Sequence, residues 1–298
     1  MSNNTTKWLT GCGIGCAVII AIAVLIIMVG YMLVKNTINE FKETETSTEL
    51  VEERFGKARD FCPRADGKIE AERMEAFLTV RDSIAGVSAE LEKTLLTIAG
   101  EIEKAENKEI KPFNMVMNIV GKGIKAIPLM VEFYKVRNYA LLETNMGLGE
   151  YYYIYILTYY SYLGKPPEDG PDFQLAGDNK DGKKSWHYDD SDEDMDSYKE
   201  EVKRERRYRI VKKIHRLFHS MLSCQLEELE TSGSLNQKRS LKRKLKNEIQ
   251  ALNENRERIP WQDGLPDIIK QSFEPYKLRL NESYNEMVNA VELNPNRK

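Results

Sequence analysis

Cysteine is scarce in this sequence: the 298 residues include four. Cys12 and Cys16 lie in an apolar run, which leaves Cys62 and Cys224 as one possible pair. One pair is not a disulfide framework, and no Cys-x-x-Cys spacing of the metal-binding kind is present. Cysteine usage therefore leaves the redox compartment of the protein open.

The sequence also lacks the signatures of nucleophilic catalysis. It contains no G-x-S-x-G motif, no P-loop and no cysteine beside a histidine in a recognisable catalytic frame. Positive and negative charges nearly cancel, at a formal net charge of −3, so the chain has no global attraction to nucleic acid. We expect no catalysis, no cofactor and no nucleic-acid partner.

The longest uncharged run, residues 8–34, predicts a membrane anchor. About 20 apolar residues span a bilayer core, so this run of 27 residues is long enough to cross with some tilt. A cleaved signal peptide has a shorter apolar region, and a lipobox follows its apolar stretch whereas Cys12 precedes this one. A helix buried in a protein core is a weaker explanation than a membrane span, because 27 consecutive residues carry no charge.

Small side chains occur four residues apart at the start of the anchor. Gly11 and Gly15 lie on one helix face, and Cys12 and Cys16 on the adjoining face. This spacing allows two membrane helices to approach closely, so these residues are candidates for helix packing. The alternative is chance, because small residues are common in membrane helices.

The charges that flank the anchor do not fix its orientation. Lys7 precedes the anchor, whereas Lys35 and Lys42 follow it, which favours a cytoplasmic C-terminal domain. A very short tail before a single early span instead favours a signal anchor that exports the rest of the chain. We expect the second arrangement, with residues 35–298 on the extracytoplasmic side of the membrane.

Composition predicts a mainly α protein, in which a single transmembrane helix precedes a helical bundle with a long acidic loop. No convincing run of alternating strand residues occurs. The predicted parts are a polar tail (1–7), the transmembrane anchor (8–34), a helical stalk or linker (35–66), the first half of the bundle (67–164), an acidic loop rich in proline and glycine (165–201), the second half of the bundle (202–292) and a tail (293–298).

Apolar residues recur every seven positions in the first half of the bundle. Phe77, Ile84, Leu91 and Ile98 form this stripe, and Val80, Val87, Leu95 and Ile102 occupy neighbouring positions. Such a pattern requires a partner helix, from this chain or from another. The stripe and the small residues of the anchor together suggest self-association or a protein partner.

A tyrosine-rich stretch, residues 146–164, closes what we predict to be one long helix that runs to Gly164. Its nearly continuous apolar and aromatic character predicts a central helix. Gly147 and Gly149 would allow a neighbouring helix to approach it closely. Glu143, Asn145 and Glu150 exclude a second membrane span.

The tyrosine-rich stretch has two readings. In one, the tyrosines are core packing. In the other, residues 139–163 line a pocket for an apolar or lipid-like ligand, with Glu150, Tyr152, Tyr155 and Tyr159 as candidate binding residues.

Two histidines one helical turn apart are candidate metal ligands. His215 and His219 point the same way on a predicted helix, and Glu143 from another helix could complete a site for a metal-dependent enzyme. No H-E-x-x-H or Glu-x-x-His motif supports this reading, and histidines at the edge of a core explain the spacing equally well. A membrane-anchored interaction module is therefore our leading hypothesis, ahead of the ligand pocket and the metal enzyme.

Overall fold

The computed structural model describes residues 42–106, 112–173, 192–231 and 237–293. The chain divides into two units, Met1–Thr46 and Ser47–Lys298. In the first unit residues 42–46 are helical, and in the second a helical segment covers 47–55. Besides this segment the described residues contain eight α-helices, α2 to α9, and no strand, which confirms the mainly α prediction.

The predicted anchor, residues 8–34, lies outside the described residues, as do its packing candidates Gly11, Cys12, Gly15 and Cys16. In the part of the chain that the structure does describe, no helix combines the length and the apolar character needed to cross a membrane.

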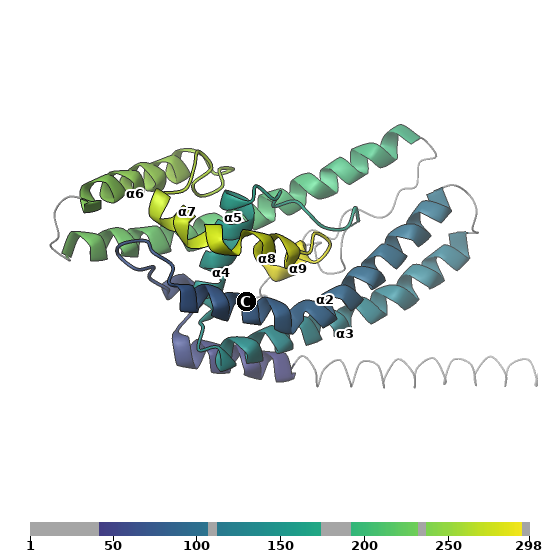
Figure 1. The fold of residues 1–298 in the computed structure, drawn as a ribbon. Coiled ribbons are helices and arrows are strands. Elements are labelled where there is room, and N and C mark those ends of the chain that lie inside the picture. Colours follow the sequence, from purple (N-terminus) through teal and green to yellow (C-terminus); the bar gives the residue numbers. More distant parts are fainter. Residues whose placement is uncertain (1–41, 107–111, 174–191, 232–236, 294–298) are drawn as a thin grey trace, which may run out of the picture. The chain divides into compact units, whose positions relative to one another are not determined.

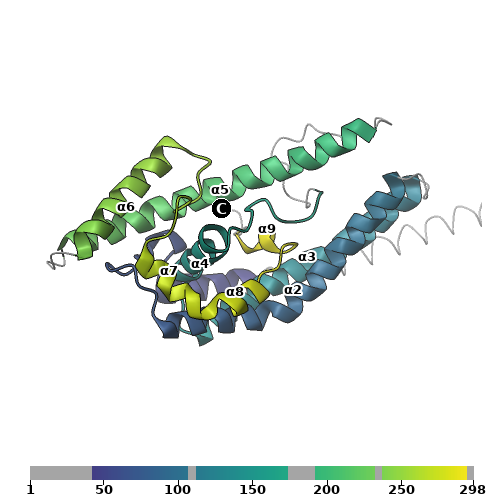
Figure 2. The same ribbon diagram turned by 45° about the horizontal axis from the view of Figure 1, so that its top comes forward.

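Helices α2 (Ala71–Glu106) and α3 (Pro112–Glu143) lie side by side as a hairpin (Figures 1 and 2). The heptad stripe of α2 is buried: Ile84 and Leu91 are at most 1 % exposed in this hairpin, and Phe77, 0 % exposed, packs against Tyr151 and Tyr159. A seven-residue apolar repeat keeps one helix face toward a neighbour, and here the neighbour is α3. The partner helix that the stripe requires is therefore supplied by the same chain.

The break between α3 and α4 (Leu148–Ile156) falls at Asn145, not at Gly164 as predicted. Asn145 has φ 52°, and the amides of Met146 and Asn145 donate to the carbonyls of Leu141 and Leu142 at 2.9 and 3.3 Å. This is the Schellman arrangement, in which a left-handed residue closes a helix, and asparagine adopts that conformation more readily than most residues. The prediction of one continuous helix through 139–163 is wrong for this reason.

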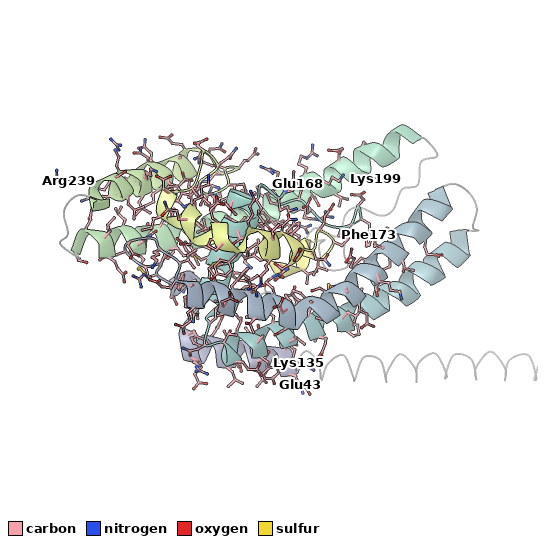
Figure 3. All side chains as sticks on the ribbon, viewed as in Figure 1. Glu43, Lys135, Glu168, Phe173, Lys199 and Arg239 are labelled. Atoms are coloured by element: carbon pink, nitrogen blue, oxygen red, sulfur yellow. A yellow bond between two sulfur atoms is a disulfide. The ribbon has the colours of Figure 1, made fainter. Side chains whose placement is uncertain are left out.

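Helix α4 continues into a π-helical segment, η2 (Leu157–Tyr162), and the two form the centre of the core. The amide of Leu163 donates to the carbonyl of Thr158 at 2.9 Å, a spacing of five residues that widens the turn. The predicted central helix is confirmed here, because Tyr151, Tyr155 and Tyr159 are each 0 % exposed. Figure 3 shows side chains filling the space around this segment.

Helices α5 (Asp192–Thr231) and α6 (Gln237–Glu254) pack against each other as a second hairpin (Figures 1 and 2). Helix α5 begins at Asp192, so the predicted acidic loop at 165–201 is too long at its C-terminal end. Acidic residues are favourable in the first turn of a helix because of the helix dipole. The acidic cluster that was predicted to be a loop therefore includes the start of α5.

The last elements are α7 (Asp267–Phe273), η3 (Glu274–Tyr276), α8 (Lys277–Glu282) and α9 (Asn289–Glu292). Helix α7 packs against α2 and η2, and α8 also contacts η2 (Figure 2). We call residues 283–293, which include α9, the C-terminal segment. The elements after α6 therefore reach back to the first half of the bundle.

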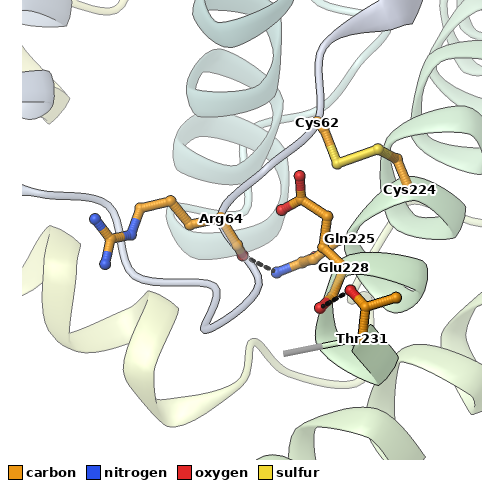
Figure 4. The surroundings of a disulfide bond; sticks show 6 residues. All are labelled: Cys62, Arg64, Cys224, Gln225, Glu228 and Thr231. Atoms are coloured by element: carbon orange, nitrogen blue, oxygen red, sulfur yellow. Dashed lines mark hydrogen bonds between the residues drawn. A yellow bond between two sulfur atoms is a disulfide. The ribbon is translucent and has the colours of Figure 1, made fainter. Parts of the chain in front are cut away.

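A disulfide joins Cys62, just after the short helix η1 (Ala58–Asp60), to Cys224 of α5 (Figure 4). Beside it, the side-chain amide of Gln225 donates to the carbonyl of Arg64 at 2.9 Å. The one cysteine pair that the sequence left open is therefore bonded.

Candidate functional site

The tyrosines of α4 and η2 build a buried polar centre against the C-terminal segment. Tyr151, Tyr155 and Tyr159 follow one another at four-residue spacing, and the Tyr155 and Tyr159 ring centroids are 4.6 Å apart. The wider π turn adds Tyr160, whose hydroxyl reaches the same acceptor as that of Tyr155. Sequence spacing and one widened turn thus aim several phenols at one place.

A buried ion pair joins the first half of the bundle to the C-terminal segment. Arg81 of α2 pairs with the carboxylate of Glu292, and the two side chains are 4 % and 2 % exposed. Arg81 donates to the Tyr151 hydroxyl at 3.0 Å, and that hydroxyl donates to the other Glu292 oxygen at 3.0 Å. A second Arg81 nitrogen donates to the carbonyl of Ser283 at 2.6 Å. The two opposite charges therefore compensate each other in a dry environment.

Asn289 uses its whole side-chain amide in the same centre. Its oxygen accepts from the hydroxyls of Tyr155 and Tyr160 at 2.9 and 2.7 Å. Its nitrogen donates to the carbonyls of Pro167 and Asp169 at 3.0 and 3.3 Å. An amide offers two lone pairs and two hydrogens, so none is left without a partner at this fully buried position.

Burial raises the pKa of the phenols in this centre. It is the main cause of the raised pKa of both Tyr155 and Tyr160, and the charge of Arg81 opposes the increase. The phenols therefore stay protonated at neutral pH and act as hydrogen-bond donors.

Two more cations lie beside this centre, around the ring of Tyr152. Arg137 of α3 donates to the carbonyl of Glu292 at 3.1 Å, and its guanidinium carbon lies 5.7 Å from the Tyr152 ring centroid. Lys213 of α5 donates to the carbonyl of Leu293, and its ammonium lies 4.3 Å from the same ring centroid. Burial lowers the pKa of Lys213, and the positive charges of Arg137 and Arg216 lower it further.

Glu150, the predicted ligand-binding carboxylate, forms an ion pair with Arg73 of α2. The closest contacts of the two groups are 2.5 and 2.7 Å, and Arg73 also donates to the carbonyl of Asn145. A cavity of about 50 Å³ lies beside Glu150 and is lined by Phe61 and Tyr153 among others. This volume holds a few water molecules, whereas ligand pockets are typically several hundred Å³.

The other predicted ligand-binding residues do not share a pocket with Glu150. Tyr152 is 1 % exposed and faces Arg137 and Lys213, whereas Tyr155 and Tyr159 are 0 % exposed and face the C-terminal segment. The structure therefore buries the three predicted tyrosines in the core, away from the cavity beside Glu150.

The predicted metal ligands are not brought together. The Nε2 atom of His215 lies 2.7 Å from the carbonyl oxygen of Arg258, while His219 and Glu143 are exposed on different helices. Among the described residues, the group with metal-ligand spacing is Cys62, Cys224 and Glu228, and its two sulfurs form the disulfide.

Sequence reasoning missed the charged residues of the centre. Arg81 and Arg137 lie one turn from buried Phe77 and Phe133, so each is a charged residue on an apolar helix face. That interruption is a usable signal, because arginine is rarely buried unless it is paired. Glu292 and Asn289 gave a weaker signal, since they follow a short loop near the end of the chain.

The chain was compared with protein-family models, with curated proteins and with solved structures, and none of them matches it. The site therefore has to be interpreted from its own geometry.

Proposed function

We propose that this is a single-pass membrane protein whose helical domain acts on the extracytoplasmic side by binding a protein partner or a second copy, without catalysis. The uncharged run at 8–34 supports the tether to the lipid bilayer. The Cys62–Cys224 bond is the observation that supports export, since disulfides persist in oxidising compartments and are rare in the cytosol.

Binding is favoured over catalysis by how the charged groups are used. Arg81 and Glu292 are buried in an ion pair, and Glu150 is paired with Arg73. These carboxylates are committed to holding helices together, so they are poor candidates for proton transfer to a substrate. Binding at an exposed helix face is therefore the function that these contacts favour.

Helix α5 offers such a face. Arg204, Tyr208, Lys212 and Arg216 are exposed at four-residue spacing, and Tyr208 is 61 % exposed with Lys212 over its ring at 5.5 Å. Arginine and tyrosine are the residue types that contribute most to protein interfaces. A partner with an acidic surface fits this face by charge.

The orientation is tested by cysteine labelling of the full-length protein in intact cells. A membrane-impermeant maleimide should label Cys62 and Cys224 only after mild reduction, because both sulfurs are bonded and face the outside. Labelling that occurs without reductant, and only in broken cells, would place the domain in the cytoplasm and contradict the proposal.

The interaction is tested by crosslinking in native membranes. We expect crosslinked species in the wild type, and their loss in the variant R204E/R216E, because like charges would then meet across the interface. The matched control is R239E/R243E on α6, which makes the same charge change away from the α5 face and should crosslink as the wild type does. A strictly monomeric, partnerless wild type would dispose of the interaction role.

An apolar-ligand role for the 139–163 region is the second candidate, although the cavity beside Glu150 and Tyr153, at about 50 Å³, is smaller than typical ligand pockets. Mass spectrometry of the purified protein under native conditions should then show a bound apolar molecule. A mass that corresponds to the chain alone would remove this candidate.

A further inference from the structure

Three cations, Arg81, Arg137 and Lys213, lie in the centre of the domain, and one of them has a carboxylate partner, that of Glu292. Arg81 and Tyr151 occupy both carboxylate oxygens of Glu292. Arg137 and Lys213 donate only to carbonyl oxygens, and among the described residues neither forms an ion pair. In the part of the chain that the structure describes, one side of the centre is therefore compensated in charge, whereas the cations of the other side lack a carboxylate partner.

The positive side also has donors without acceptors. The Nε atom of Arg137 and the hydroxyl of Tyr152 make no hydrogen bond to any described group, although the two residues are 3 % and 1 % exposed. Buried donors in proteins are nearly always partnered, and a buried charge without a counter-charge is strongly unfavourable. These groups therefore call for an acceptor that carries negative charge.

Both cations lie against the same aromatic ring. The Arg137 guanidinium and the Lys213 ammonium lie 5.7 and 4.3 Å from the centroid of the same ring, that of Tyr152. Lys213 is half-buried and Arg216, three residues further along α5, is exposed, so this side of the centre reaches the surface along α5.

We propose that Arg137, Lys213 and Tyr152 form a binding site for a small oxyanion, such as the phosphate or carboxylate group of a metabolite. All three side chains are donors, which suits an oxyanion with several acceptor lone pairs and excludes a metal cation. The guanidinium supplies a planar fork and the ammonium a point charge, a combination common in phosphate and carboxylate recognition. This site does not depend on the proposed membrane function.

The test uses the purified full-length protein in detergent, with inorganic phosphate and acetate as probes and chloride at matched ionic strength as the reference. Binding to the folded state raises the unfolding temperature as the probe concentration increases. We expect a rise with phosphate or acetate beyond that in chloride. Equilibrium dialysis with radiolabelled phosphate then gives the affinity.

Two variants and one control locate the effect. Lys213→Met should weaken binding at least about tenfold, because it removes a charge-assisted hydrogen bond. Tyr152→Phe removes only a hydroxyl that has no partner, so it should fold normally and still weaken the response. Lys270→Met makes the same change as the first variant at an exposed position on α7 and should respond as the wild type does.

Two outcomes would overturn the site. One is a wild-type unfolding temperature that depends on ionic strength alone. The other is phosphate and acetate binding that is unchanged in both Lys213→Met and Tyr152→Phe, since the anion would then bind elsewhere. If Lys213→Met does not fold, the result for Tyr152→Phe decides.

Discussion

At Arg81 the chain places a permanent charge where only 5 % of the residue is exposed. What makes this possible is a set of three partners for its terminal nitrogens: the Glu292 carboxylate, the Tyr151 hydroxyl and the Ser283 carbonyl. A buried ion pair adds little net stability compared with apolar residues of the same size, but loss of one member leaves the other charge uncompensated. The pair therefore makes the position of the C-terminal segment specific.

Single substitutions in this pair should be costly. Arg81→Met or Glu292→Gln should lower the free energy of unfolding by about 3–5 kcal/mol, measured by urea denaturation, because each leaves an unpaired buried charge. The double variant R81M/E292L should recover much of the loss, since neither charge then remains.

The control is the exposed pair of Arg279 and Glu75, whose side chains are 49 % and 52 % exposed. Arg279→Ala should change the free energy of unfolding by no more than about 1 kcal/mol, because exposed ion pairs are weak. Equal losses from the buried and exposed pairs would contradict the role assigned to Arg81.

At the same scale, sequence patterns predicted which tyrosines are buried but not what their hydroxyls contact. The neighbours of Tyr155 and Tyr159 along the helix are mostly apolar or aromatic, and this local pattern predicts that the two rings are buried. The partner of Arg81 is 211 positions away, and no local pattern encodes a pairing at that distance. The same holds for the candidate metal set, because helical spacing alone does not determine whether Glu143 lies near His215.

At the scale of elements, η1 and α4 approach each other closely at Gly149, one of the glycines for which the sequence predicted a close neighbour. A Cβ atom at Gly149 would lie 2.5 Å from both the carbonyl oxygen of Ala58 and the Cβ of Phe61. The two segments can therefore pack together only because residue 149 has no side chain. The prediction that glycines in this stretch admit a close neighbour is confirmed.

Gly149→Ala should lower the free energy of unfolding by about 1–3 kcal/mol, because backbone atoms at 2.5 Å cannot yield as a flexible side chain would. Gly86→Ala is the matched control: it lies inside α2, and nothing is within 4 Å of the added Cβ. There the same substitution should stabilise the protein by up to about 1 kcal/mol through helix propensity. Thermal unfolding of the two variants checks both signs, and a stabilising Gly149→Ala would refute the close approach.

The hairpins α2–α3 and α5–α6 could be predicted as elements because their apolar stripes repeat locally. The end of α3 could not, since it depends on one asparagine with a left-handed backbone and not on the proline at position 128, which α3 contains. Proline removes one hydrogen bond, and in a long packed helix the remaining contacts outweigh that loss.

For the molecule as a whole, the buried phenols predict a stability limit at high pH. Their pKa values are raised in the fold, with burial as the main cause for Tyr153 and Tyr155, whereas in the unfolded chain they ionise near 10. The unfolded state therefore binds fewer protons than the folded state above this pH, and the free energy of unfolding falls as pH rises. The contribution is fully present below pH 10 and is lost toward the higher pKa of the folded state.

Urea unfolding followed across the alkaline range should show this decline, and absorbance of the phenolate should rise together with loss of helicity. Tyr153→Phe should shift the onset to higher pH, since Phe cannot ionise. Phenolate absorbance from all tyrosines near pH 10 in a fully helical protein would show that the rings are accessible to solvent.

The Cys62–Cys224 bond spans 162 positions, and the Arg81–Glu292 contact spans 211. During synthesis the thiol of Cys62 therefore has no partner until Cys224 has been made, and Arg81 has no counter-charge until Glu292 has been made. A premature stop before Asn289 would release a product that has every long helix and yet no closed interior. Such a product is a natural target for the proteases that survey newly made proteins.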